Sequence, residues 1–217
     1  MRYLLVVLIL LFIASCASIK TIEPMHKGEI KLTADIGGPL FRFNGMPIFM
    51  PLSSIGGAYG FNNSVSAYAS LHTTSLMFGT IQLETSANTS LYRSDKSGFS
   101  TNWGSYNFLT LRDHKMAFYP FADLNYYIHY NKKSNYLYFS FSSMFELHRK
   151  KAFDEPVNSR LIPNFTLGHR WVKEKYEWGL ELKWLNFFTD NRNIVVDYIA
   201  PGKYGALGLY FSYTKKF

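Results

Sequence analysis

The sequence predicts an all-β protein: an antiparallel, up-and-down transmembrane β-barrel with ten strands, or with eight as the alternative. Three observations predict it. Period-two alternation of apolar residues runs for a dozen positions at a time. Aromatic residues make up 18% of the chain, and Asn, Ser and Gly separate the alternating runs. Because ordinary strands have about five or six residues, alternation of this length suits strands that cross a bilayer with an apolar exterior and a polar lumen.

The longest alternating stretch is residues 116–148, which we expect to form two strands joined by a polar turn. Pairing apolar with apolar positions requires a turn of residues 131–134, with Tyr130 opposite Asn135. The same register places Leu124 opposite Phe141 on the outside, and Asp123 opposite Ser142 on the inside.

The remaining strands are predicted from shorter alternating runs. In chain order they are residues 28–36, 54–61, 64–72, 76–86, a hairpin over 161–188, and 204–217. Residues 88–102 are rich in Ser, Thr, Gly and Asn, which predicts a loop. Residues 103–112 fit either a strand or a short helical turn. An even strand count favours the strand, which would be the tenth.

Residues 39–53 are unusual because they combine three prolines with many apolar side chains. Proline density argues against a paired central strand. A loop this apolar is expected to fold over the barrel mouth or to dip into the membrane. A strand pair broken by prolines is the alternative.

A soluble, lipocalin-like barrel is the competing architecture, since alternation alone does not say which face lies inside. Strand length and the tryptophans near strand ends favour the membrane. The last strand ends with Phe217 after alternating apolar residues, which resembles the C-terminal signature of outer-membrane barrels, although Lys215 departs from it.

The N-terminus has the features of a secretory signal. Arg2 precedes an apolar run over residues 4–13, which is too short to span a bilayer as a helix. The sequence Ile-Ala-Ser-Cys at residues 13–16 resembles the lipobox of bacterial lipoproteins. An ordinary signal peptide with an incidental cysteine is the alternative.

The lipobox resemblance implies three parts: a signal peptide (1–15), an acylated N-terminus and tether (16–27), and the barrel (28–217). Cys16 would carry the lipid, palmitate included. The residue after it is Ala17 rather than the Asp of inner-membrane retention, so the resemblance implies an outer-membrane protein. With an inner-leaflet anchor, both ends of the barrel domain are expected on the periplasmic side.

The net charge of +8 predicts attraction to anionic membrane lipids, either phospholipid headgroups or lipopolysaccharide phosphates. An envelope protein is a further candidate partner. Nucleic acid is disfavoured because the charge is scattered and the chain carries a secretion signal. Six lysines are expected at one periplasmic rim, against headgroups or simply solvated: Lys132, Lys133, Lys173, Lys175, Lys215 and Lys216.

Few residues predict chemistry, and no metal-binding or cofactor-binding motif is recognisable. A turn over residues 172–175 would place Arg170 opposite Glu177 as a lumen ion pair. Tyr119, Glu146 and His148 should meet at the extracellular rim, where His148 could act as a general base.

The favoured function is a structural or envelope-interaction barrel with a filled polar lumen. The alternatives are a conduit or binding protein for a small or lipidic ligand, and an envelope-lipid hydrolase.

Overall fold

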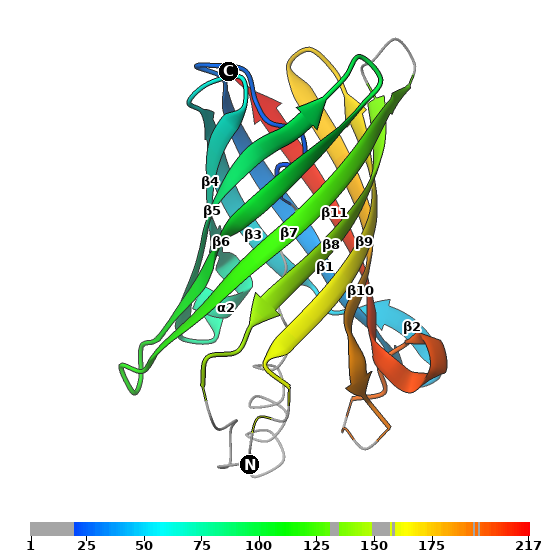
Figure 1. Cartoon of the computed structure of the whole chain (residues 1–217). Helices are drawn as coiled ribbons and strands as arrows, with labels where there is room; N and C mark the ends of the chain where they lie inside the picture. Colours follow the sequence, from blue (N-terminus) through cyan, green and yellow to red (C-terminus); the bar gives the residue numbers. More distant parts are fainter. Residues whose placement is uncertain (1–19, 131–134, 149–156, 158, 193, 195) are drawn as a thin grey trace.

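The chain forms one antiparallel sheet that closes on itself as a barrel (Figure 1). The computed structural model describes residues 20–130, 135–148, 157, 159–192, 194 and 196–217. Among these residues, eleven strands belong to the sheet, and β2 extends from β1 alone, so ten strands form the wall. Sequence neighbours are neighbours in the wall, and β1 pairs with β11 to close it. The predicted ten-stranded up-and-down barrel is confirmed.

The strands are long, as the alternation predicted. They are β1 (Ile30–Phe43), β2 (Met46–Phe49), β3 (Leu52–Gly60), β4 (Val65–His72), β5 (Thr80–Arg93), β6 (Ser97–Thr110), β7 (Met116–Tyr130), β8 (Asn135–Phe145), β9 (Leu161–Val172), β10 (Tyr176–Asp190) and β11 (Tyr204–Lys216). The short helices α2 (Thr73–Met77) and η3 (Pro201–Lys203) lie in connections. Within the described residues, no helix combines the length and apolarity needed to cross a membrane.

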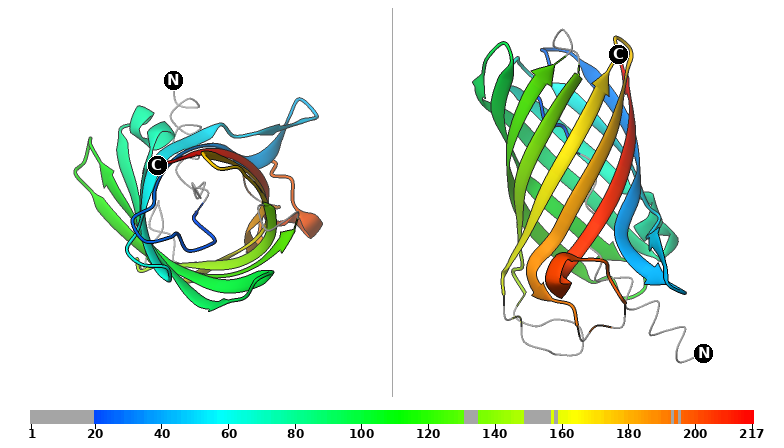
Figure 2. Two further views of the ribbon diagram at one scale, coloured as in Figure 1. Left: turned by 90° about the horizontal axis from the view of Figure 1, so that it is seen from above. Right: turned by 90° about the vertical axis from the view of Figure 1, so that its right-hand side faces the viewer.

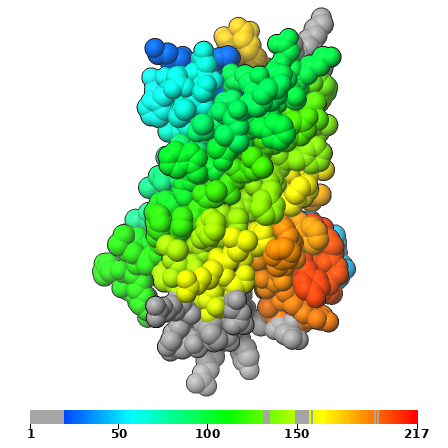
Figure 3. Space-filling view, viewed as in Figure 1, coloured from blue at the N-terminus to red at the C-terminus, as the bar shows by residue number. Residues whose placement is uncertain are grey.

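The wall has an apolar outer face and a polar inner face. Leu124, Phe141 and Leu182 point outward and are 50%, 48% and 41% exposed. Asp123 and Asn125, which alternate with them, are buried inside. A lipocalin-like barrel would have the opposite arrangement, with its apolar side chains inside. The chain is therefore a transmembrane barrel, whose outward side chains suit lipid. On the side drawn in Figure 3, side chains cover the wall from β5 to β9 without a visible opening.

The two ends of the barrel differ in their connections. At the turn end, which also holds the C-terminus, short turns join β3 to β4, β5 to β6 and β9 to β10 (Figure 1). Asn62 forms the first of these as an Asx turn, since its Oδ1 accepts hydrogen bonds from the backbone N–H groups of Ser64 and Val65. At the loop end, longer connections join β8 to β9 and β10 to β11.

The structure confirms the predicted register of the central hairpin. Tyr130 pairs with Asn135, Leu124 with Phe141, and Asp123 with Ser142. The turn itself, residues 131–134, lies outside the described residues.

The predicted register of the second hairpin is wrong by two residues. Glu177 pairs with Val172, and Arg170 pairs with Gly179. The turn is residues 173–175, because the Lys173 N–H donates to the Tyr176 carbonyl at 2.9 Å. A shift of two positions keeps every side chain on its predicted face, so alternation could not detect it.

Three stretches that the sequence assigned to a loop or left between alternatives are mostly strand. Residues 88–102 form the ends of β5 and β6, so that prediction was wrong. Residues 103–112 largely belong to β6, the strand needed to reach ten. Within residues 39–53, β1 continues to Phe43 and pairs with β2, so the alternative of a strand pair is correct there.

Candidate functional site

Residues 20–27, which we call the plug, lie inside the barrel (Figure 2). The blue trace in the left view of Figure 2 runs within the ring of strands. Lys20 reaches mid-depth, since it contacts Asp123, the eighth of the fifteen residues of β7. Lys27 lies at the turn end, where its N–H donates to Asn63 Oδ1. The residues expected to be a free tether therefore fill the lumen, whereas Cys16 lies outside the described residues.

Side chains of the wall donate hydrogen bonds to four backbone carbonyls of the plug. Asn88 Nδ2 donates to the carbonyls of Thr21 and Ile22, at 3.1 and 3.2 Å. Ser100 donates to Ile22 as well. Arginines reach two further carbonyls: Arg93 donates to that of Pro24 and Arg170 to that of Lys20. Buried carbonyls need such donors, so the wall is chemically matched to an extended peptide.

Apolar side chains fix the plug at two further points. Ile22 is 3% exposed and belongs to a buried cluster with Tyr127, Tyr136 and Tyr138. Met25 is 2% exposed and packs with Ala58 and Tyr68. Burying an aliphatic side chain of this size contributes about 1.5–3 kcal/mol. The plug is therefore packed against the wall, and does not simply pass through an open pore.

A glycine of the wall makes room for the plug. A Cβ on Gly60 would lie 2.0 Å from the carbonyl oxygen of His26 and 3.3 Å from Cβ of Met25. Because the first distance is a clash with backbone, a larger residue at this position would displace the plug from the turn end.

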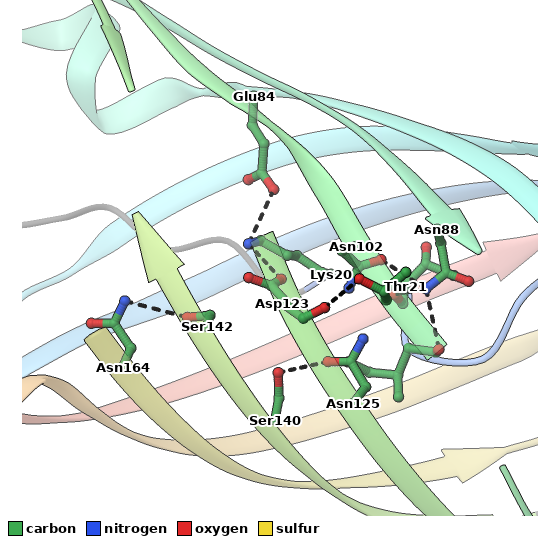
Figure 4. A network of polar contacts seen from close by, with 12 residues as sticks. Lys20, Thr21, Glu84, Asn88, Asn102, Asp123, Asn125, Ser140, Ser142 and Asn164 are labelled. Atoms are coloured by element: carbon green, nitrogen blue, oxygen red, sulfur yellow. Dashed lines mark hydrogen bonds and ion pairs between the residues drawn. The ribbon is translucent and has the colours of Figure 1, made fainter. Parts of the chain in front are cut away.

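The first charge cluster of the lumen centres on Lys20 (Figure 4). Its Nζ donates to Asp123 Oδ2 at 2.8 Å and lies 4.0 Å from Glu84 Oε1. Glu84 also lies 3.8 Å from His72 Nε2. Nearby, Asn88 donates to Asn102, and Ser140 donates to Asn125. A cation of the plug thus lies between two carboxylates of the wall.

The second charge cluster lies toward the turn end and centres on Glu177. Lys31 Nζ of β1 lies 2.8 Å from Glu177 Oε1, and Lys216 Nζ of β11 lies 3.1 Å from the same atom. Lys31 also approaches Glu29 at 3.7 Å. All the cations of this cluster come from the wall.

Arg170 and Glu177 do not stand opposite each other as predicted. Arg170 Nη2 lies 3.4 Å from Glu181 Oε1, and Arg170 Nη1 donates to Ser212 Oγ at 2.7 Å. Glu181 also accepts from Tyr138 and pairs with Lys183 at 3.0 Å. The guanidinium group lies over Gly179, where an added Cβ would come within 2.3 Å of it. The predicted pairing fails because of the two-residue register shift.

Little space is left around the plug. A cavity of about 30 Å³ lies on its loop-end side, lined among others by Phe121, Met144 and Leu185. A second cavity of about 20 Å³ lies on its turn-end side, between Tyr136, Thr214 and the Glu177 cluster. Lys20 and Ile22 line both cavities, so the plug stands between them.

The lysines predicted at one rim are only partly described, because Lys132 and Lys133 lie outside the described residues. Lys175 and Lys216 are adjacent at the turn end, where the Lys216 N–H donates to the Lys175 carbonyl. Lys173 and Lys215 lie beside the same turn. The Lys216 ammonium group, however, points inward to Glu177. For Lys216 the predicted headgroup role is replaced by a lumen ion pair.

Tyr119, Glu146 and His148 meet at the loop end as predicted. His148 Nδ1 lies 2.8 Å from Glu146 Oε1, and the Tyr119 and His148 ring centroids are 5.7 Å apart. The His148 side chain is 45% exposed. Within the described residues, no group of three His, Cys, Asp or Glu is arranged to hold a metal ion.

A flange projects from the barrel at the loop end. We give this name to the end of β1 (residues 40–43) and its partner β2, which lie outside the wall (Figure 1). Phe43 and Met46 are 57% and 64% exposed. Arg42 approaches Asp197, which also accepts from Lys203 at 3.0 Å. That hydrogen bond holds the pKa of Asp197 below its usual value.

The residues that hold the plug were not predicted from the sequence. Asn88, Ser100 and Asn102 were placed in a loop because the stretch is polar. The available signal was the polar alternation of Gln82, Glu84, Ser86 and Asn88, which continues the inward face of β5. Lys20 and Ile22 carry no periodic pattern, and nothing in the sequence indicates that they lie in a lumen.

A ten-stranded transmembrane barrel filled by an internal segment is the class that this geometry defines. No family model matches the sequence, and no curated protein matches it. An outer-membrane channel of Pseudomonas putida F1 is similar in structure, with a TM-score of 0.53, 9% identity and coverage of 93% of this chain and 100% of that one. The outer-membrane protein OprG of Pseudomonas aeruginosa matches with a TM-score of 0.32, 9% identity and coverage of 91% and 99%. At these identities the likeness concerns the fold alone.

Proposed function

We propose that the protein is an outer-membrane β-barrel lipoprotein whose lumen is closed by its own plug and whose role is structural or one of envelope interaction. The plug carries the proposal, because the cavities beside it measure only about 30 and 20 Å³. A cavity needs about 10–15 Å³ to hold one water molecule, so each cavity has room for two or three waters at most and neither gives a larger solute a path. A closed lumen favours a role on the outside of the barrel.

The orientation follows from the connections. Outer-membrane barrels have short periplasmic turns and longer extracellular loops. We therefore assign the turn end to the periplasm and the loop end to the cell exterior. The plug then occupies the periplasmic half of the lumen, with Lys20 at mid-depth. The flange lies beside the outer leaflet.

The position of the plug limits where a lipid on Cys16 can lie. Lys20 lies four positions after Cys16, and four residue steps span at most about 14 Å. Half of an apolar band about 25 Å tall is about 12 Å. The periplasmic half of the lumen already holds residues 21–27, with about 20 Å³ to spare. We therefore propose that a lipidated Cys16 lies at the extracellular mouth, and not on the inner leaflet as the lipobox resemblance implied.

An epitope tag inserted after Ser18 tests this orientation. Antibody should label the tag on intact cells, as it should label a tag in the connection between β8 and β9. Labelling only after the outer membrane is permeabilised would return the anchor to the periplasmic side.

The flange is our candidate contact surface for lipopolysaccharide. Phe43 and Met46 can enter the acyl region beside the wall. Arg42 and Lys203 share the single carboxylate of Asp197, which leaves one positive charge for a phosphate group. Replacing both cations with Gln should weaken binding to lipopolysaccharide vesicles, and the difference should shrink at high salt.

Conductance in planar bilayers tests the closed lumen. The unaltered chain should give no steady current. Lys20→Glu places a third carboxylate between Asp123 and Glu84, which should expel the plug and open a cation-selective pore. Lys27→Glu is the matched control, since Lys27 is exposed at the rim. Equal steady currents through the unaltered chain and Lys20→Glu would contradict the proposal that the plug closes the lumen.

A gated conduit for a small or lipidic ligand is the second candidate. One observation favours it: residues 20–29 belong to no strand, so the plug could leave without breaking the sheet. Under voltage, the unaltered chain would then open briefly. Openings with the same ion selectivity as the Lys20→Glu pore would favour this candidate. Silence at every voltage would favour the structural role.

A further inference from the structure

The surroundings of the Lys20 ammonium group have the composition of a recognition site for a primary amine. Its Nζ lies 2.8 Å from Asp123 Oδ2, 4.0 Å from Glu84 Oε1 and 3.5 Å from the centroid of the Phe121 ring. The Tyr106 ring lies on a further side, at 5.4 Å. Carboxylates hold an ammonium group through charge and hydrogen bonds, and aromatic faces attract it through their quadrupole. We call Asp123, Glu84, Phe121 and Tyr106 the cage.

The cage belongs to the wall and does not depend on the plug for its position. Glu84 of β5 pairs with Tyr106 of β6, and Asp123 and Phe121 lie on β7, which pairs with β6. All four side chains are buried. Side chains fixed on three paired strands remain in place when a ligand exchanges, which is what a binding site requires.

The cage also has an unused acceptor. Asp123 Oδ1 is buried and has no hydrogen-bond partner among the described residues. Lys20 engages only the other oxygen, Oδ2. An unsatisfied buried carboxylate oxygen is costly, and a second N–H donor would satisfy it. A free amine, which is not tethered to a backbone, could approach both oxygens of this carboxylate.

The cage adjoins the loop-end cavity. Lys20, Asp123, Phe121 and Tyr106 line that cavity together with the apolar side chains of Met144 and Leu185. An alkyl chain attached to an ammonium group could therefore lie along Met144 and Leu185 while its nitrogen occupies the cage. The space filled by the four methylene groups of Lys20 would become available to the same alkyl chain.

We propose that the cage is a binding site for linear aliphatic primary amines, including polyamines, and that Lys20 occupies it as a tethered substitute. The inference goes beyond the closed-barrel role, since it assigns a ligand class to the lumen. It also gives displacement of the plug a chemical trigger, because an amine competes directly with Lys20.

Chemical rescue of Lys20→Ala tests the proposal on the full chain in detergent. Butylammonium chloride should raise the Tm of Lys20→Ala with saturation, whereas butanol and tetramethylammonium chloride should not. The unaltered chain should respond much less, because Lys20 fills the cage. Lys27→Ala is the matched control and should behave like the unaltered chain.

Variants of the cage sharpen the result. Adding Phe121→Leu to Lys20→Ala should weaken butylammonium binding about tenfold, since it removes a desolvated cation–π contact. Adding Asp123→Asn should abolish the rescue. If Lys20→Ala does not fold alone, its folding yield is titrated with butylammonium instead.

A saturable rise in Tm or yield that Asp123→Asn removes supports the site. The absence of any rise, or an equal rise in Lys27→Ala, overturns it. This experiment measures stability, whereas the closed lumen is tested by conductance. The amine site and the closed lumen can therefore fail independently of each other.

Discussion

The two charge clusters of the lumen differ in where their cations come from. Asp123 forms an ion pair with Lys20, a residue of the plug. Glu177 forms two ion pairs, with Lys31 and Lys216, which lie on the strands that close the barrel. The mid-lumen cluster is therefore complete only with the plug in place, whereas the turn-end cluster is complete without it. At the turn end, the strands neutralise the buried carboxylate of Glu177 with their own lysines. At mid-depth, Asp123 depends on Lys20 of the plug for its ion pair.

The largest effect is expected from Lys20→Ala. Removing one partner of a buried pair leaves a carboxylate without its cation, which costs about 3–5 kcal/mol. Urea unfolding in detergent micelles should report this loss, and Lys27→Ala should change the free energy of unfolding by less than about 0.5 kcal/mol. Equal stability of the two variants would mean that the plug does not hold the mid-lumen cluster.

Glu177→Gln should have the next largest effect. It leaves Lys31 and Lys216 close together without the carboxylate that they share. Because both lysine side chains retain some contact with water, at 14% and 18% exposure, we expect a loss of about 2 kcal/mol, below that of a fully buried pair. The same urea titration measures it. A loss larger than that of Lys20→Ala would reverse the order of the two clusters.

Lys31→Met alone should cost only about 1 kcal/mol, because Lys216 still neutralises Glu177. The double variant Lys31→Met/Lys216→Met should lose more than the sum of the two single variants, since only then is the carboxylate orphaned. A double-mutant cycle measures this coupling. Strict additivity would show that the two lysines do not substitute for each other.

His148→Ala should have the smallest effect, because His148 lies at the loop end outside both clusters. We expect a change in stability of less than about 0.5 kcal/mol. The variant should also restore every envelope-lipid phenotype of a strain that lacks the protein. Loss of a lipid-modifying activity in this variant alone would favour the hydrolase alternative.

The wall could be predicted from the sequence because a residue's face depends only on the parity of its position. Leu124 and Asp123 were assigned to opposite faces correctly, and the central register followed from matching faces. The register of Arg170 could not be fixed in this way, because a two-residue slip keeps both faces intact. The contact of its guanidinium group with Gly179 distinguishes the two registers, and alternation carries no such information.

The contents of the lumen could not be predicted, for a different physical reason. A segment held by side chains rather than by a β-ladder needs no period in its sequence. Lys20, Ile22 and Met25 sit on the plug at positions that fit pockets of the wall, and those pockets exist only after the barrel closes. The donors that hold the plug, such as Asn88 and Ser100, are small polar residues, which are as typical of loops as of lumens.

Thiol accessibility at Ile22 tests the central claim, that the plug fills the lumen, most directly. In a Cys16→Ser background, Ile22→Cys and the matched control Lys27→Cys are treated with a membrane-impermeant maleimide in the folded state. Because Ile22 is 3% exposed and Lys27 lies at the rim, Lys27→Cys should react at once. Ile22→Cys should react only after unfolding in urea. Equal rates at the two positions in the folded protein would contradict a plugged barrel.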